Sequence, residues 1–149
     1  MRRDDTAAER VHALAARTNL SRTLGFSLVE GGAGHATLAM TVDERHLNAM
    51  GACHGGVIFA LADEAFGMAS NSHGVMAAGI DAHITYQVAV QAGDRLVAAA
   101  TEVSRSRRLA VYAVEVRNGD GVLVSRFTGT VYVTGKHHEP PLPGHEHGA

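Results

Sequence analysis

Positions 46–72 read HLNAMGACHGGVIFALADEAFGMASNS, and this stretch decides the fold. From Gly56 to Ser72 it is rich in Ala, Leu, Met and Phe, and it lacks the alternation of apolar and polar residues that marks a half-buried strand. The pattern predicts a long apolar helix that follows a polar, glycine-containing loop. Two adjacent carboxylates, Asp63 and Glu64, interrupt the middle of this helix, and acidic residues are rare in buried segments.

The predicted helix has two different sides when its residues are placed about 100° apart. One side is broadly apolar and suited to packing on a sheet, with Glu64 toward its edge, so we interpret Glu64 as structural. The other side is a narrow stripe of small residues around one carboxylate: Gly56, Ala60, Asp63, Gly67 and Ser70. No Lys or Arg lies three or four residues from Asp63, so a salt bridge within the helix cannot pair it. We expect its partner to come from elsewhere.

The composition is that of one globular domain, with 149 residues of which 46% are hydrophobic. A formal net charge of -2 without a basic block argues against a nucleic-acid-binding protein. The single cysteine excludes an intrachain disulfide. No signal peptide and no apolar span of about 18 residues is recognisable, so we expect a cytoplasmic protein that does not enter a membrane. Residues 136–149, rich in His and Pro, are predicted to be a disordered tail, with metal binding as the alternative.

The rest of the chain reads as one more helix and six strands. Residues 1–20 are predicted to hold an amphipathic helix, about 4–17, and a lead-in, and residues 21–135 a single domain. Strands are expected at about 24–30, 35–42, 75–87, 95–105, 109–117 and 123–133. Because the long helix is used once and the later strands are linked by hairpins, a parallel βαβ stack does not fit. We predict an α+β fold with an antiparallel sheet wrapped around the helix.

The motif residues resemble those of a known family. Asn48, the triplet His54-Gly55-Gly56, Asp63 and the pair Asn71-Ser72 are similar to the motif of hotdog-fold acyl-CoA thioesterases of the phenylacetate-degradation (PaaI-type) branch. The resemblance extends from about Leu24 to Val133. It implies hydrolysis of an aromatic or medium-chain acyl-CoA, no cofactor or metal, and a homodimer as the minimum, with a homotetramer expected.

The resemblance also implies roles for individual residues. The Gly55 backbone N–H would polarise the thioester carbonyl, Gly56 would leave room for the thioester, and Asn48 and His54 would hold it and shape the loop. Asp63 would act as general base or nucleophile from the opposite subunit. Simpler structural interpretations remain: Asn48 as a turn residue, His54 as a hydrogen bonder at a helix start, and Asp63 as a buried acid that only accepts hydrogen bonds.

Several further expectations concern the pocket. Phe59 and Phe66 are predicted to line it and, by desolvation, to raise the pKa of Asp63. The cluster of Arg105, Arg107 and Arg108 is the candidate site for the phosphates of coenzyme A, with a solvated hairpin tip as the alternative.

The sequence leaves one role of the family's site unfilled. The family often has a Ser or Thr near the position of Gly79 to hold the attacking water, so Ser72 or Asp81 would have to hold it here.

Other functions remain open at this point. A non-catalytic acyl-CoA-binding module and an acyl-thioester hydratase or dehydratase are the alternative functions. A nucleophilic Cys53 is disfavoured because no base is spaced to activate it.

Overall fold

The computed structural model describes residues 3–139. Helices α1 (Arg3–Ala15) and α2 (Asn19–Leu24) come first, followed by β1 (Ser27–Gly32), β2 (His35–Thr41) and a short 3-10 turn (Glu44–His46). The long helix α3 (Gly55–Asn71) precedes β3 (Val75–Tyr86), β4 (Arg95–Arg105), β5 (Leu109–Arg117) and β6 (Leu123–His137). The predicted long helix and six strands are thus confirmed, and the bounds of β4 and β5 agree with the prediction.

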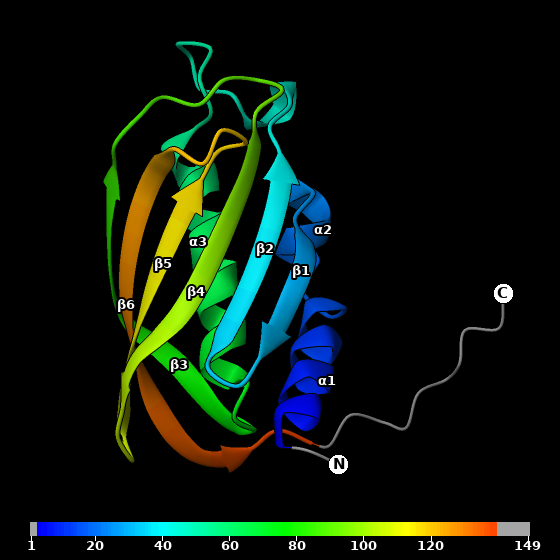
Figure 1. Cartoon of the computed structure of the whole chain (residues 1–149), viewed down its shortest axis with the longest axis vertical. Coiled ribbons are helices and arrows are strands. Elements are labelled where there is room, and N and C mark those ends of the chain that lie inside the picture. Colours follow the sequence, from blue (N-terminus) through cyan, green and yellow to red (C-terminus); the bar gives the residue numbers. More distant parts are fainter. Residues whose placement is uncertain (1–2, 140–149) are drawn as a thin grey trace, which may run out of the picture.

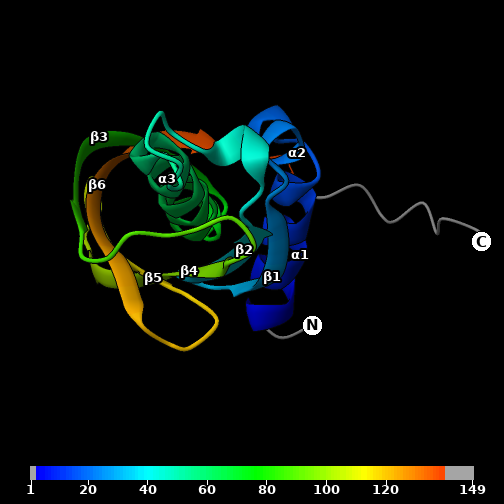
Figure 2. The ribbon, with the colours of Figure 1, turned by 90° about the horizontal axis from the view of Figure 1, so that it is seen from above.

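The six strands form one antiparallel sheet in the order β1-β2-β4-β5-β6-β3. The sheet curves around α3, which lies lengthwise in its concave face (Figures 1 and 2). This arrangement confirms the predicted α+β fold. Along β5, buried and partly exposed residues alternate, because successive side chains of a strand point to opposite faces.

The core lies between α3 and the concave face of the sheet. The apolar side of α3 is fully buried at Leu61, Ala62, Ala65 and Ala69. The small alanines let the helix approach the strands closely, and Phe66 fills the remaining space. Its ring centroid lies 5.4 Å from that of Phe127 and 5.9 Å from that of Tyr112. Phe66 therefore belongs to the packed core as well as to the pocket wall predicted for it.

The fit around Phe66 depends on Gly129 of β6. A Cβ atom at this position would lie 2.7 Å from Cζ of Phe66 and 2.9 Å from Cε1 of Phe127. We expect Gly129→Ala to lower the free energy of unfolding by about 1–3 kcal/mol through overpacking. Gly135→Ala, where a Cβ meets nothing within 4 Å, is the control. Denaturant titration of both variants checks this, and equal stability of the two would contradict the packing argument.

The amino-terminal helices are part of the same core. Val11 of α1 is fully buried, and a Cβ at Gly31 of β1 would lie 2.4 Å from its Cγ1, so the strand can approach α1 only with glycine there. The prediction of a strand from Leu24 is wrong, because residues 19–24 form α2. Tertiary contact explains this: buried Ser21 donates a hydrogen bond to Oε2 of Glu64 on α3 at 2.8 Å. Gly25, with φ of 78°, ends α2.

The last strand is longer than predicted. β6 continues to His137, and the backbone N–H of His138 donates to the Gly74 carbonyl at 2.8 Å. Residues 136–139 therefore belong to the ordered fold, which corrects the start of the predicted tail. The remaining part of that tail, residues 140–149, lies outside the described residues.

Strand β3 lies at the edge of the sheet, and within residues 3–139 it pairs only with β6. All residues from 78 to 83 are exposed, so neither face of this segment is covered within the chain. Ile80, which is 60% exposed, lies in it. A bare edge strand of this kind is a site where another strand can pair.

Candidate active site

The start of α3 presents one unused backbone donor. His54 is the N-cap, and its Nδ1 accepts a hydrogen bond from the Gly56 N–H at 2.8 Å. The N–H groups of Val57 and Ile58 both donate to the His54 carbonyl. The Gly55 N–H finds no acceptor among residues 3–139. This free donor at the positive end of a helix can bind an oxyanion.

The loop before α3 is shaped by Asn48. Its Oδ1 accepts hydrogen bonds from the N–H groups of Met50 at 2.9 Å and Ala52 at 3.2 Å, and Gly51 adopts a φ of 82°. Asn48 therefore does act as a turn residue. Its side-chain NH2 has no acceptor in the described part of the chain, so a role in binding is compatible with this geometry.

Tyr86, at the end of β3, contacts the start of α3. Its hydroxyl donates to the Gly55 carbonyl at 2.9 Å, and its Cζ would lie 3.2 Å from a Cβ at Gly55. Burial raises the pKa of Tyr86, so the phenol keeps its proton and remains a donor. The two residues are 31 positions apart, and no local pattern relates them.

Asp63 lies eight residues further along α3. The residue as a whole is exposed in the single chain, and it has no ion pair within residues 3–139. Its carboxylate is nevertheless partly enclosed by neighbouring residues, and this partial burial raises its pKa above the ordinary value. The negative charge of Glu64 raises the pKa further. The predicted direction is thus confirmed. Glu64 is partly buried and holds α2 through Ser21, in agreement with its structural interpretation.

A cavity of about 490 Å³ opens beside Asp63. It follows the second half of the stripe of small residues on α3, from Asp63 to Ser70, and Gly79 of β3 forms part of the facing wall. Its lining is mixed, and its members are Leu14, Thr18, Asp63, Glu64, Phe66, Gly67, Met68, Ser70, Asn71, Ala77, Gly79 and His138. Phe66 lies in this wall, whereas Phe59 does not and packs edge-on against Phe127 at 5.5 Å.

A second cavity, of about 330 Å³, lies at the start of α3. Asn48, Gly55 and Tyr86 are among the residues that line it. Helix α3 thus borders both cavities: Gly55 lines the smaller one and Asp63 lines the larger one. At a rise of about 1.5 Å per residue, the eight positions between these two residues correspond to about 12 Å. The two groups are too far apart to act on one carbonyl within one chain.

Two other residues considered from the sequence, Ser72 and Cys53, are buried. Ser72 is buried, accepts a hydrogen bond from the Gly34 N–H and donates to the Ala69 carbonyl, so it is not available to hold a water molecule. Cys53 is buried as well, and burial raises the pKa of its thiol to about 11. A neutral, buried thiol is a poor nucleophile, which agrees with the preference against Cys53.

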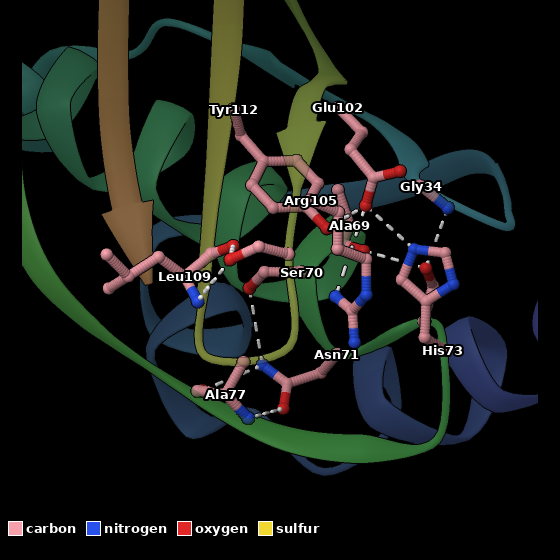
Figure 3. Close-up of polar contacts among 12 residues, drawn as sticks. Gly34, Ala69, Ser70, Asn71, His73, Ala77, Glu102, Arg105, Leu109 and Tyr112 are labelled. Carbon is pink, nitrogen blue, oxygen red and sulfur yellow. Dashed lines mark hydrogen bonds and ion pairs between the residues drawn. The ribbon is translucent and has the colours of Figure 1, made fainter. Parts of the chain in front are cut away.

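The predicted arginine cluster is divided. Arg107 and Arg108 are exposed in the β4–β5 turn, at the foot of Figure 1, whereas α3 begins at the top. Arg105 instead points inward, with Nη1 buried and 4.0 Å from Oε1 of Glu102 (Figure 3). Arg105 is therefore part of an internal network.

That network is centred on Glu102 (Figure 3). Its Oε1 lies 2.6 Å from the Tyr112 hydroxyl and 2.8 Å from Nε2 of His73. Burial of Glu102 opposes ionisation, but these hydrogen bonds and the positive charges of His73 and Arg105 outweigh it, so the pKa of Glu102 is lowered. The pKa of Tyr112 is raised by burial and by its bond to the carboxylate. The network joins β4 and β5 to the segment after α3.

Comparison with known proteins gives the family. The thioesterase superfamily model matches residues 50–125, which include α3, strands β3, β4 and β5, and the start of β6. A relative from Archaeoglobus fulgidus, described as a candidate esterase, is 45% identical over 76% of this chain and 73% of its own. The acyl-coenzyme A thioesterase PaaI of Escherichia coli is 33% identical over 83% of this chain and 88% of its own.

Solved structures agree with these sequence matches. The Escherichia coli PaaI structure superposes with a TM-score of 0.88 at 31% identity, covering 91% of this chain and 99% of that one. A Streptococcus mutans structure bound to acetyl CoA gives a TM-score of 0.73 at 34% identity, over 76% of this chain and 91% of that one. The chain belongs to the thioesterase superfamily and is a hotdog-fold thioesterase of the PaaI type.

No helix within residues 3–139 is both long and apolar enough to cross a lipid bilayer. The same residues contain no cluster of three or more His, Cys, Asp or Glu side chains arranged to hold a metal ion. The histidines at positions 145 and 147 of the predicted tail lie outside the described residues.

Proposed function

We propose that the protein hydrolyses an aromatic or medium-chain acyl-CoA to the free acid and CoA. The observation that carries this proposal is the distribution of two unpaired groups along α3: the free N–H of Gly55 at its start and the unpaired carboxylate of Asp63 at its middle. An acyl-transfer site needs a preorganised donor for the oxyanion and a base or nucleophile for the carbonyl carbon. The chain supplies both.

In the proposed reaction the thioester carbonyl oxygen accepts the hydrogen bond of the Gly55 N–H. In the general-base route, Asp63 takes a proton from water while the water oxygen bonds to the carbonyl carbon, and the tetrahedral intermediate then expels the CoA sulfur, which takes up that proton. In the nucleophilic route, the Asp63 carboxylate bonds to the carbonyl carbon and the tetrahedral intermediate expels CoA as a thiolate, which leaves a mixed anhydride. Water then cleaves the anhydride, regenerates the Asp63 carboxylate and supplies the proton that the CoA thiolate takes up. Developing negative charge on oxygen is stabilised at the N-terminus of α3. The Tyr86 hydroxyl, which donates to the Gly55 carbonyl, keeps the backbone of Gly55 in place.

The substrate class is supported by the relatives and by the cavity. The Escherichia coli relative carries the name of an acyl-coenzyme A thioesterase, and the Streptococcus mutans neighbour binds acetyl CoA. The cavity beside Asp63, with apolar Leu14, Phe66 and Met68 in its wall, suits an aromatic or medium-length acyl group. Exposed Arg107 and Arg108 are proposed to contact the CoA phosphates.

We also propose that the site is shared between two chains. Gly55 and Asp63 are too far apart along one helix, so each would meet its counterpart from a second copy. The bare edge of β3 supports this arrangement, because pairing with the same strand of a partner is isologous and closes after two chains. Two such dimers would form a tetramer, and the exposed side chains of Val103, Leu109 and Tyr132 on the sheet are candidates for that contact.

Mixed dimers test the shared site. Asp63→Asn and Gly55→Pro chains are each expected to be almost inactive, but a dimer with one of each has one site with both wild-type residues. When equal amounts are refolded together, half of the dimers are mixed, so activity should return to about a quarter of the wild-type value. Thiol release measured before and after mixing checks this. No recovery, although mixed dimers are detected by differential tagging, would contradict a shared site.

The function itself is tested with a panel of phenylacetyl-, hydroxybenzoyl- and octanoyl-CoA, followed by release of free thiol. Hydrolysis of at least one substrate is expected. Binding of these thioesters without thiol release would favour a non-catalytic acyl-CoA-binding module. A change in enoyl-CoA absorbance without thiol release would instead favour a hydratase.

A further inference from the structure

We propose that the cavity along α3 holds the acyl group and that His138, from the segment after β6, sets the length of acyl chain that this cavity accepts. The inference rests on the proposed function, because it takes Asp63 to mark the position of the thioester. It adds a specificity residue from a segment that belongs to none of the motifs in positions 46–72.

The cavity extends along α3 from Asp63 to Asn71. Asp63, Gly67 and Asn71 lie four residues apart, so they follow one another along the same face of α3, and all three line the cavity. Their span is about 12 Å at a rise of about 1.5 Å per residue. Gly67 keeps the path open, since a Cβ there would meet nothing within 4 Å. An acyl group whose carbonyl lies at Asp63 therefore extends toward Asn71.

Two side chains that are held by hydrogen bonds, Asn71 and His138, line the far end of this path. Asn71 is held by three hydrogen bonds to backbone groups: its Nδ2 donates to the carbonyls of Gly67 at 2.8 Å and Ala77 at 3.2 Å, and its Oδ1 accepts from the Ala77 N–H at 2.9 Å. Figure 3 shows its contacts with Ala77 and with the hydroxyl of Ser70. Nε2 of His138 lies 2.8 Å from the same Oδ1. Because Oδ1 accepts, Nε2 of His138 must carry the proton.

The position of His138 is fixed by hydrogen bonds at its backbone and at its ring. Its backbone N–H donates to the Gly74 carbonyl at 2.8 Å, so the segment after β6 is tied to the turn after α3. Burial, together with the positive charges of Arg10 and Arg17, lowers the pKa of His138, which favours the neutral ring. A neutral imidazole, anchored at backbone and side chain, is a compact wall at the end of an acyl pocket.

The steric consequence is a limit on length. A phenylacetyl or hexanoyl group ends before this wall, whereas an extended dodecanoyl chain would have to displace it. Removing the imidazole should lengthen the cavity, and replacing it with a larger ring should shorten it. Neither change touches Asp63 or the start of α3.

The experiment measures kcat/KM for hexanoyl-, octanoyl- and dodecanoyl-CoA with the full chain. His138→Ala is expected to raise the dodecanoyl-to-hexanoyl ratio about tenfold, in the range that a few methylenes in an apolar pocket can give. His138→Phe should lower that ratio. His138→Gln, which keeps an N–H donor for Asn71, separates loss of the wall from loss of the bond. His137→Ala, an exposed neighbour outside the cavity lining, is the matched control and should leave the ratio unchanged.

Binding of S-hexyl-, S-octyl- and S-dodecyl-CoA, thioethers that cannot be hydrolysed, is measured by calorimetry in parallel. If no CoA thioester is hydrolysed but His138→Ala still shifts thioether preference toward the longer chain, the proposed function fails and the length limit stands. An unchanged ratio in His138→Ala overturns the inference, and so does an equal shift in His137→Ala. Absence of thioether binding to the wild-type protein overturns it as well.

Discussion

Asp63→Asn is expected to lower kcat for CoA-thioester hydrolysis by about 10²–10⁴-fold, the usual contribution of a positioned acid or base. The amide has nearly the shape of the carboxylate, so the pocket is preserved, but it can neither take a proton from water nor attack a carbonyl. KM should change little, because the lost interaction belongs to the transition state. Steady-state kinetics on the best substrate of the thioester panel measures this.

The matched control is Asp120→Asn in the exposed β5–β6 turn, which carries the same chemical change at a residue that lines neither cavity. It should have wild-type kinetics. Because the pKa of Asp63 is raised and the ionised form is the active one, wild-type kcat should fall as the pH drops through that raised value. Wild-type turnover in Asp63→Asn would show that the proposed mechanism is wrong even if the activity is real.

The same substitution is expected to stabilise the fold at neutral pH. With its pKa raised above 3.8, folded Asp63 binds a proton more tightly than unfolded Asp63, so the ionised carboxylate is a cost to folding. That cost is present above the raised pKa and disappears as the pH falls to the ordinary value. The Tm of Asp63→Asn should therefore exceed that of the wild type at neutral pH, with the difference closing in acid. A difference that widens in acid would contradict the sign of the shift.

Gly55→Pro is expected to lower kcat by about 10²–10³-fold, the usual effect of removing one oxyanion donor. Proline removes the single backbone N–H that α3 leaves free, at the first helical position, where proline is favoured because no N–H is needed there. His54, with φ of -61° and ψ of 132°, already has the conformation required before proline. The helix should therefore form normally, which circular dichroism can verify.

The control is Gly55→Ala, which introduces a similar Cβ 3.2 Å from the Tyr86 ring but keeps the N–H. The difference in kcat between the proline and alanine variants therefore measures the contribution of the Gly55 N–H donor separately from the steric effect of the added carbon atoms. If both variants lose activity equally, the space at Gly55 matters and its N–H does not.

The main elements could be predicted because local patterns encode them. The apolar segment after the His54 triplet forms α3 within one residue of the expected start, and the alternation in β5 gives its bounds. The separation of Asp63 from Glu64 followed from helical geometry alone. The short helix α2 was missed, because its six residues have little intrinsic helix signal and are held by the contact of Ser21 with Glu64.

The sequence by itself determined the fold class, the start of the long helix to within one residue, and the lack of a partner for Asp63 within that helix. The last two depend on neighbours within a few positions, and the fold class depends on the order of helices and hairpin-linked strands. Only the tertiary structure decided which groups meet. Tyr86 contacts Gly55 across 31 positions, and His138 contacts Asn71 across 67. Such contacts depend on how the sheet curves around α3, because strand order and register bring distant residues together, and no periodicity in the chain records them.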